Sequence, residues 1–342
     1  MKLNTIAIDL AKNSFYIVGF GTSNKPQWRK KLTRKALTRF MATQERSKVV
    51  MEACSGAHDW GRRLGAYGHD VELLPPQHVK AYLRGQKNDY NDAQAIGEAS
   101  LHGAIRPVAV KTVEQQDEQA FHRIRQQLKS EQTGLINQMR GLLSEYGIVI
   151  PKGIAQAHKA IPNILEDAEN GLSLRFRELL HRQYRHYQQV RDEIAWYDQT
   201  LKQYAKEDEP LMRLLEVPGL GPVNASQLKA WMGGGEQFEC GRHASAALGL
   251  VPRQHSTGGK ERLYGITKRG NASLRTSIIH GARSVLIRSK GKTDRLSRWV
   301  NALIERRGFN KAAVALANKI VRIAWVIPVS YTHLTLPTKP SG

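Results

Sequence analysis

Cysteine and long apolar runs are scarce in this sequence. Its 342 residues include two cysteines, Cys54 and Cys240, which are too few for a disulfide framework or a cysteine-ligated metal site. No run approaches the roughly 18 consecutive apolar residues of a membrane-spanning helix. Asp9 interrupts the apolar stretch near the N-terminus, which argues against a signal peptide. We therefore expect a protein of the reducing cytoplasm with no membrane partner.

Acidic residues are also in short supply. Lys and Arg number 52 against 30 Asp and Glu, which gives a formal net charge of +22. The surplus is uneven, because residues 1–110 carry a net +8, residues 111–210 a net −1 and residues 211–342 a net +15. A surplus of this size predicts a polyanionic partner, and we expect that partner to be nucleic acid. A near-neutral middle between two basic ends predicts three segments with different tasks.

The first segment, 1–110, alternates strand patterns with helix patterns. Short runs rich in apolar and β-branched residues are followed by stretches of helical periodicity, which is typical of an α/β domain. We expect strands at 3–9, 15–20, 28–32, 48–52, 70–74 and 106–110, and helices at 34–44, 57–67 and 89–101.

The second segment, 111–210, is predicted to be helical. Apolar residues recur at intervals of three, four and seven over 121–146, and at intervals of three and four over 187–204. Such stripes favour helices packed along a coiled-coil seam, either within one chain or between chains. Pro151 and Pro162 are expected to mark the connection between the two helices.

The third segment, 211–328, is rich in Gly, Lys and Arg and is predicted to be mainly α-helical, with a last helix at 310–326. Residues 329–342 break this pattern abruptly and show no helical period. They resemble a translated cloning linker, so we expect a non-native tail there.

Four acidic residues occupy positions where a charged carboxylate destabilises the fold unless it binds a partner. Asp9 and Glu52 end apolar strands, while Asp89 and Asp92 lie three residues apart and share one face of an expected helix. Acids at the ends of adjacent strands and on a nearby helix can converge, and converging carboxylates need divalent cations to stay ionised together. Oxygen ligands favour Mg²⁺ or Mn²⁺, and two such ions would activate the attacking oxygen and stabilise the leaving oxygen of a phosphodiester.

Each of these acids, taken singly, is also compatible with a turn-forming or helix-capping role. The order Asp, Glu, Asp-x-x-Asp on an α/β framework is more specific. It resembles the ribonuclease-H-like fold of Holliday-junction resolvases.

A glycine-containing turn lies within the apolar stretch 214–228. Gly219 and Gly221 alternate with Pro and Leu there, in a pattern that resembles a helix-hairpin-helix motif. Glycines permit close backbone approach, and the next helix would offer free N–H groups to phosphate without reading base sequence. A turn between helices with no ligand remains the alternative.

A hydroxyl-rich, glycine-flexible loop follows at 256–260, beginning with Ser256. Serine is a poor nucleophile unless its oxygen is steered and the phosphate charge is neutralised. His255 is either a general base or a hydrogen-bonding partner. On chemistry alone, a phosphate-binding loop without a nucleophile is favoured. The side chains that would neutralise phosphate are Lys260, Arg262, Lys268, Arg269 and Arg275.

Six motifs follow one another along the chain: IAIDLAKNSF, VVMEACSGAHDW, LLPPQHVKAYLRGQKNDYNDAQAI, VPGLGPVNA, LGLVPRQHSTGGKERLYGITKRGNASLR and AVALANKIVRIAW. Together they resemble the DEDD transposases of insertion-sequence family 110, in particular its 1111 subgroup, over residues 4–327. The resemblance implies a ribonuclease-H-like N-terminal domain, a coiled-coil middle that helps to assemble a dimer or tetramer, and a C-terminal transposase domain. The DEDD set falls on Asp9, Glu52, Asp89 and Asp92.

The same resemblance implies an activity. Members are bacterial site-specific DNA recombinases, and those characterised are guided by a bridge RNA encoded in the noncoding end of the element. Metal-bound carboxylates and a serine then form a composite site, and the serine becomes a covalent phosphoserine that a free 3′ hydroxyl resolves. We carry the serine over to Ser256, with Ser245 as the alternative. Some members have two serines where this chain has Ser256 and Thr257, and the odd tail departs from the family's C-terminal end.

Two other functions remain open. A junction-resolving, Mg²⁺-dependent nuclease would use only the four acids, and a non-catalytic nucleic-acid-binding protein would use only the basic surface.

Overall fold

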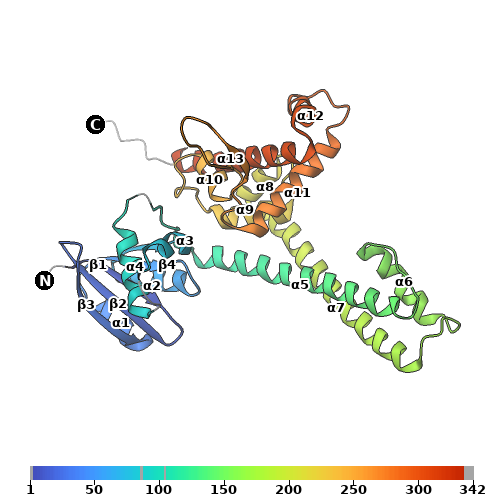
Figure 1. Ribbon diagram of the computed structural model, residues 1–342, viewed down its shortest axis with the longest axis horizontal. Coiled ribbons are helices and arrows are strands. Elements are labelled where there is room, and N and C mark those ends of the chain that lie inside the picture. Colours follow the sequence, from blue (N-terminus) through green and yellow to red (C-terminus); the bar gives the residue numbers. More distant parts are fainter. Residues whose placement is uncertain (1–2, 85–87, 104, 335–342) are drawn as a thin grey trace. The chain divides into compact units, whose positions relative to one another are not determined.

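The computed structural model describes residues 3–84, 88–103 and 105–334. The chain forms two compact units, Met1–Glu114 and Gln115–Gly342 (Figure 1). The first unit contains a mixed β-sheet with helices, and the second is almost entirely helical. The expected α/β beginning and helical remainder are therefore confirmed, while the finer division at residues 210 and 328 stays a prediction. Within the described residues, no helix is both long and apolar enough to cross a bilayer.

The first unit is built on a five-stranded sheet of order β3-β2-β1-β4-β5. Three strands form an antiparallel meander, and β4 and β5 then run parallel to β1. The parallel pairs require crossover connections, which the helices supply. The strands are β1 (Leu3–Leu10), β2 (Ser14–Gly21), β3 (Pro26–Thr33), β4 (Lys48–Glu52) and β5 (Asp70–Leu74); the helical elements are α1 (Arg34–Ala42), α2 (Ala57–Ala66), α3 (Pro76–Val79), η1 (Lys80–Tyr82) and α4 (Asp89–Ser100).

Helices cover both faces of this sheet, and strand alternation divides the core between them. Ile6, Ile8 and Met51 pack with α1 and α2 on one face, whereas Ala7 and Val50 pack with α4 on the other. Successive side chains of a strand point to opposite faces. The residues two positions after Ala7 and Val50 on their strands therefore also lie on the α4 face.

One glycine sets how closely α4 approaches the sheet. A Cβ on Gly97 would overlap the Phe20 ring, which is fully buried on β2. The absent side chain thus lets α4 lie directly over the strands, and the close approach fixes where the first turn of α4 stands.

The expected strand at 106–110 is wrong. Within that stretch a single bridge joins Val108 to Leu73, at the free edge of β5. Val108 and Val110 instead pack as irregular chain against the core on the α1 and α2 face. Their apolar character reflects burial rather than a continuous ladder of hydrogen bonds.

Two long antiparallel helices dominate the second unit, as Figure 1 shows. They are α5 (Val113–Ser144) and α7 (Leu174–Glu207), and α6 (Ile154–Glu166) lies between them in sequence. Arg125 of α5 pairs with Asp198 of α7 at 2.6 Å, and His186 of α7 lies 2.9 Å from Glu131 of α5. The partner of the later residue on α5 comes earlier on α7, so the two helices run antiparallel.

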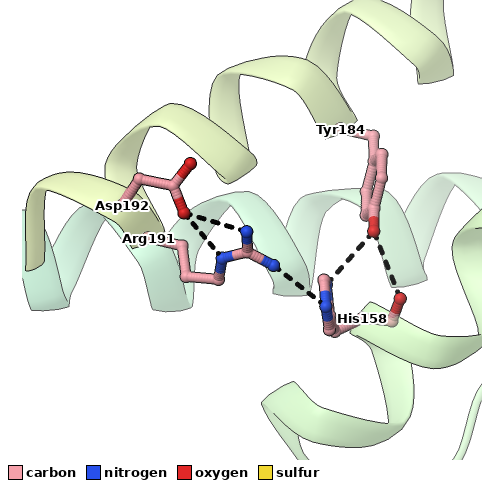
Figure 2. Close-up of polar contacts among 4 residues, drawn as sticks. All are labelled: His158, Tyr184, Arg191 and Asp192. Atoms are coloured by element: carbon pink, nitrogen blue, oxygen red, sulfur yellow. Dashed lines mark hydrogen bonds and ion pairs between the residues drawn. The ribbon is translucent and has the colours of Figure 1, made fainter. Parts of the chain in front are cut away.

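Pro151 and Pro162 lie in the connection between α5 and α7, as predicted, but that connection contains α6, and Pro162 lies inside this helix. Proline has no N–H, so the His158 carbonyl four residues earlier lacks its helical donor. Figure 2 shows the substitute: the Tyr184 hydroxyl of α7 donates to that carbonyl at 3.2 Å. The Arg191 guanidinium lies 2.9 Å from Nε2 of His158, and also binds Asp192. These bonds fasten α6 to α7 and compensate for the proline.

The rest of the second unit packs around one apolar core. Its elements are α8 (Glu209–Leu215), α9 (Pro222–Met232), α10 (Gly241–Ala247), β6 (Pro252–Gln254), β7 (Leu263–Ile266), α11 (Ala272–Arg288), α12 (Arg295–Arg307) and α13 (Phe309–Leu334). The last helix extends through Pro328 to Leu334, six residues into the segment for which no helix was expected. Residues 335–342 of that segment lie outside the described residues.

Replacing Gly97 with Ala tests the packing of α4. The added methyl group would meet the Phe20 ring, so we expect the free energy of unfolding to fall by about 1–3 kcal/mol in chemical denaturation. Gly65→Ala is the matched control, because Gly65 lies in α2 and a Cβ there has nothing within 4 Å. Equal stability of the two variants would contradict the close approach.

Replacing Tyr184 with Phe tests the compensation for Pro162. The His158 carbonyl would lose its donor, so we expect a loss of about 1 kcal/mol in the free energy of unfolding. Tyr204→Phe is the control, since Tyr204 lies on the same helix and is 55% exposed. A Tyr184→Phe variant as stable as this control would refute the role of the hydroxyl.

Candidate active site

Strand alternation places two of the four acids on the same face of the sheet. Asp9 follows Ala7 by two residues on β1, and Glu52 follows Val50 by two on β4. Ala7 and Val50 both pack under α4, so Asp9 and Glu52 continue onto the α4 side. The two strands are parallel neighbours, which brings their carboxyl ends to one edge of the sheet.

The other two acids occupy the first turns of α4. Asn88 caps this helix, and its side chain accepts a hydrogen bond from the Tyr90 amide at 2.9 Å. Asp89 and Asp92 follow on one helical face. The N-terminal end of a helix carries partial positive charge, which lowers the cost of gathering carboxylates there.

Three of these carboxylates converge. Asp9, Asp89 and Asp92 each offer an oxygen atom, and these atoms lie within 4.8 Å of one another. Glu52 is not part of this 4.8 Å group, but its charge acts on Asp9, and the charge of Asp92 acts on Glu52. The structure therefore brings three of the four predicted acids together and leaves the fourth beside them.

The pKa values of two of these acids reflect this crowding. Burial, and then the negative charges of Asp92, Asp89 and Glu52, raise the pKa of Asp9 to about 6. Burial, followed by the charge of Asp92, also raises the pKa of Glu52. A carboxyl group that holds its proton this strongly shows that its charge is poorly compensated by the surrounding protein.

This donor set fits a divalent cation. Partly buried carboxylates in mutual repulsion are stabilised by a small ion of high charge, and a set of oxygen atoms alone favours Mg²⁺ or Mn²⁺ over zinc. Asp9, Asp89 and Asp92 would bind it directly, with Glu52 at the edge of the group.

The sequence analysis missed Tyr16 and Lys31, which border the acids. Asp9 pairs with Tyr16 across β1 and β2, and Tyr16 pairs with Lys31 across β2 and β3. The Lys31 ammonium lies 5.2 Å from the centre of the Tyr16 ring, and its bond to the Tyr16 hydroxyl raises the pKa of Lys31. Pairing residues outward from the turn between β1 and β2 matches Asp9 with Tyr16, so these neighbours of the acids could have been predicted from the sequence.

Ser256 lies in the turn between β6 and β7 of the second unit. It is exposed, and its hydroxyl oxygen accepts a hydrogen bond from the Gln254 amide at 2.8 Å. His255 is its neighbour in sequence, yet the His255 ring packs edge-to-face on Tyr264 at 5.6 Å. The serine is thus accessible and oriented from one side.

Ser245, the alternative nucleophile, is 1% exposed in α10. Its hydroxyl donates to the Arg242 carbonyl at 3.0 Å and accepts from the Asn318 amide at 3.1 Å. A hydroxyl so enclosed and bonded connects α10 to α13, and DNA would reach it only if these helices separated.

The predicted glycine turn joins α8 to α9. Gly219 has a φ of +96°, and a Cβ there would lie 2.9 Å from Ile320. Asn224 accepts from the Gly221 amide at 2.6 Å and donates to the Gly219 carbonyl at 3.0 Å. The turn is therefore held by α9 itself and packed against the core, and a phosphate-binding role for it stays a prediction.

The predicted basic residues have different surroundings. Lys260, Arg262, Lys268 and Arg269 are exposed around the Ser256 loop. Arg275 is 8% exposed, and its guanidinium donates to the carbonyls of Leu248 at 3.2 Å and Arg269 at 2.7 Å. Arg275 thus fixes the base of the loop, a placement that does not favour direct contact with nucleic acid.

Comparison with known proteins gives a consistent result. Residues 211–297 match the family described as "Transposase IS116/IS110/IS902 family", and residues 6–148 match a second family described as "Transposase", of the DEDD type. The chain is 43% identical over 325 residues to the transposase for insertion sequence element IS1111A of Coxiella burnetii, which covers 95% of this chain and 89% of the relative. It is 40% identical over 331 residues to the transposase for insertion sequence element IS1328 of Yersinia enterocolitica, which covers 97% and 98%.

Acidity provides a test of the carboxylate group. Asp9 binds its proton more tightly in the folded chain, with a pKa of about 6 against an ordinary 3.8, so the metal-free protein loses stability as pH rises between these values. Asp9→Asn removes that loss. At pH 7.5 without metal we expect the variant to be more stable in urea by about 1 kcal/mol, after allowance for partial exposure, and the difference should vanish near pH 4.

Mg²⁺ should reverse this order of stability between the wild type and Asp9→Asn. It should stabilise the wild type increasingly as pH rises through 6, because the ion no longer competes with the Asp9 proton, and it should stabilise Asp9→Asn far less. The control is Asp70→Asn, since Asp70 is exposed at the start of β5. A wild type that responds to pH and Mg²⁺ as Asp9→Asn does would disprove a cation-binding group here.

Proposed function

Because this chain belongs to the IS116/IS110/IS902 family of transposases, enzymes of DNA recombination, we propose that it cuts and rejoins DNA with a carboxylate-bound metal site and a serine nucleophile. The convergence of Asp9, Asp89 and Asp92 within 4.8 Å carries this proposal. Asp9, Asp89 and Asp92 would hold Mg²⁺ or Mn²⁺, with Glu52 completing the set. The bound ions would supply charge stabilisation for the oxygen atoms of the reacting phosphodiester.

Ser256 is the proposed nucleophile. Its exposure and its bond from Gln254 leave the oxygen open to a phosphate on its free side. As the serine oxygen bonds to phosphorus, the bond to the leaving strand oxygen breaks, that oxygen takes up the proton that the serine releases, and a phosphoserine forms. A free 3′ hydroxyl then attacks this phosphoserine, which restores the phosphodiester and the serine hydroxyl.

The exposed basic residues around this loop have an electrostatic task. Lys260, Arg262 and Arg269 would bind the DNA backbone and offset the charge that develops on the attacked phosphate. Residues 211–342 carry a net charge of +15, out of +22 for the whole chain. Contacts of this kind position DNA without reading its sequence.

Sequence would therefore be read by another component, and we propose a bridge-type noncoding RNA from the element. The antiparallel pair of α5 and α7 is the proposed coiled-coil region through which copies of the chain assemble as a dimer or tetramer. Large apolar side chains that remain exposed on these helices support that role: Ile124 (50%), Leu142 (42%), Leu179 (54%), Trp196 (58%) and Tyr204 (55%).

A second candidate is a junction-resolving nuclease that uses the acids alone. It is favoured by the surroundings of Ser256, because within the described residues its oxygen accepts a hydrogen bond from Gln254 and from no histidine. The acids, by contrast, already converge within the first unit.

Covalent trapping separates the two candidates. We expect wild-type protein, incubated with element-junction DNA, cognate RNA and Mg²⁺, to form a protein–DNA adduct that survives denaturing gel electrophoresis. Ser256→Ala should abolish the adduct, because the attacking oxygen is gone, and Asp92→Asn should lower its yield by at least 100-fold. Thr257→Ala is the control, since it removes the adjacent exposed hydroxyl.

Two outcomes would count against the serine. An adduct that persists in Ser256→Ala and disappears in Thr257→Ala would transfer the role to Thr257. Mg²⁺-dependent cleavage that is unchanged in Ser256→Ala, with no adduct in the wild type, would establish the nuclease instead.

A further inference from the structure

A cavity of about 390 Å³ lies within the second unit, outside all residues assigned above to the reaction. Its walls come from the first half of α5, from α9 and from the beginning of α11. In the sequence, α6, α7 and α8 separate α5 from α9, and α10, β6 and β7 separate α9 from α11. The three segments nevertheless meet around this space. A cavity of this size accommodates a small organic group rather than a lone ion.

Two buried polar atoms in its lining residues lack a hydrogen-bond partner: Nδ1 of His122 and Oε1 of Gln227. His122 is 7% exposed, and its other ring nitrogen, Nε2, lies 2.8 Å from the Ser226 hydroxyl. Buried polar atoms are nearly always paired in native proteins, because an unpaired one has lost its bonds to water. Both atoms are closed off from the cavity, so a ligand pairs with them only when the Gln227 amide or the His122 ring turns toward it.

The His122 ring contributes as a neutral group. Burial, followed by the charge of Arg125, lowers the pKa of His122 to about 4, so the imidazole is uncharged at neutral pH. An uncharged imidazole with one nitrogen engaged leaves a directional hydrogen-bonding group. Such a group recognises a polar heterocycle better than it recognises a simple anion.

The remaining lining residues share a chemistry. Five carry side-chain amides: Gln119, Gln126, Gln127, Gln227 and Asn271. Amides present a donor and an acceptor side by side and match the edge of an unpaired nucleobase. Trp231 adds an indole, the kind of surface on which bases stack.

The rim offers a place for negative charge. Arg123 is exposed on α5, and Asn271 and Ser273 belong to the N-terminal end of the 17-residue helix α11. A guanidinium and the positive end of a helix both attract phosphate. Amides, indole and cationic rim together match the base and the phosphate of a single nucleotide.

We propose that this cavity binds one unstacked nucleotide of a single-stranded nucleic acid, with its base among the amides and Trp231 and its phosphate at Arg123. The inference rests on the proposed function to the extent that a transposase meets such strands. It adds a contact at which the second unit reads a base directly. Once its amide turns into the cavity, the unpaired oxygen of Gln227 favours bases that carry an amino group, namely adenine, cytosine and guanine.

Free nucleotides test the proposal without engaging the wider basic surface. The full chain is titrated with the four ribonucleoside and the four deoxyribonucleoside 5′-monophosphates, and binding is followed by saturation-transfer NMR. We expect saturable binding of at least one amino-bearing base, and no comparable binding of ribose 5′-phosphate. A preference for the ribo or the deoxyribo series assigns the natural strand to RNA or DNA, and equal binding assigns it to either.

Two variants address the two parts of the ligand. Arg123→Ala removes the exposed cation, and Gln227→Leu removes the unpaired acceptor, so we expect each to weaken binding about tenfold or more. Matched controls on α7 are Arg182→Ala and Gln189→Ala, because both side chains are exposed and neither lines the cavity. The controls should bind as the wild type does.

Three results would overturn the proposal: no saturable binding of any monophosphate, equal binding of ribose 5′-phosphate, or unchanged affinity in both cavity variants. Failure of the proposed function is distinguished by Asp9→Asn and Ser256→Ala. These variants should bind the monophosphate normally, so a wild type that forms no covalent adduct but retains nucleotide binding would refute the catalytic proposal alone.

Discussion

Repulsion between carboxylates that the fold holds together is the constraint on which the first unit depends. Asp9 and Asp92 would separate if they were free to do so, since burial and then the charge of Asp92 raise the pKa of Asp9. Apolar packing opposes this repulsion, because β1 is buried on both faces and α4 is seated on the sheet through Gly97. The unit thus uses its hydrophobic core to keep a group of like charges within reach of a cation.

The second unit is stabilised by two separate apolar cores. Its helical pair buries a core where α6 folds back on α5 and α7, and a second core surrounds α11 and α13. Between these cores, polar pairs such as Arg125 with Asp198 lie beside apolar contacts such as that of Phe121 with Tyr197. Large apolar side chains are left exposed along the same helices, which is the arrangement expected of a surface that associates with another chain.

Sequence reasoning succeeded where periodicity and position coincide. The apolar run Val49, Val50, Met51 predicts the strand that Glu52 ends, and Asp89 and Asp92 share a face by helical spacing alone. It failed where tertiary contacts decide. Val108 is apolar because it covers a core, not because it belongs to a strand.

Other features were beyond the reach of a linear pattern. Pro162 lies within a helix because a tyrosine 22 residues later donates to the carbonyl it leaves free. The sequence suggested Arg275 as a phosphate ligand, but in the structure its guanidinium donates to two backbone carbonyls. The cavity beside His122 is formed by side chains from three distant stretches of sequence, so no local motif announces it.

The contact between Gly219 and Gly281 has a consequence for the evolution of this protein. A Cβ on Gly281 of α11 would overlap the Gly219 carbonyl, and a Cβ on Gly219 would itself crowd Ile320 of α13. Neither glycine is therefore free to drift independently. In a lineage that gains a side chain at position 281, the turn before α9 must retreat, and compensating changes at 219 and 320 should accumulate together as a coevolving triplet.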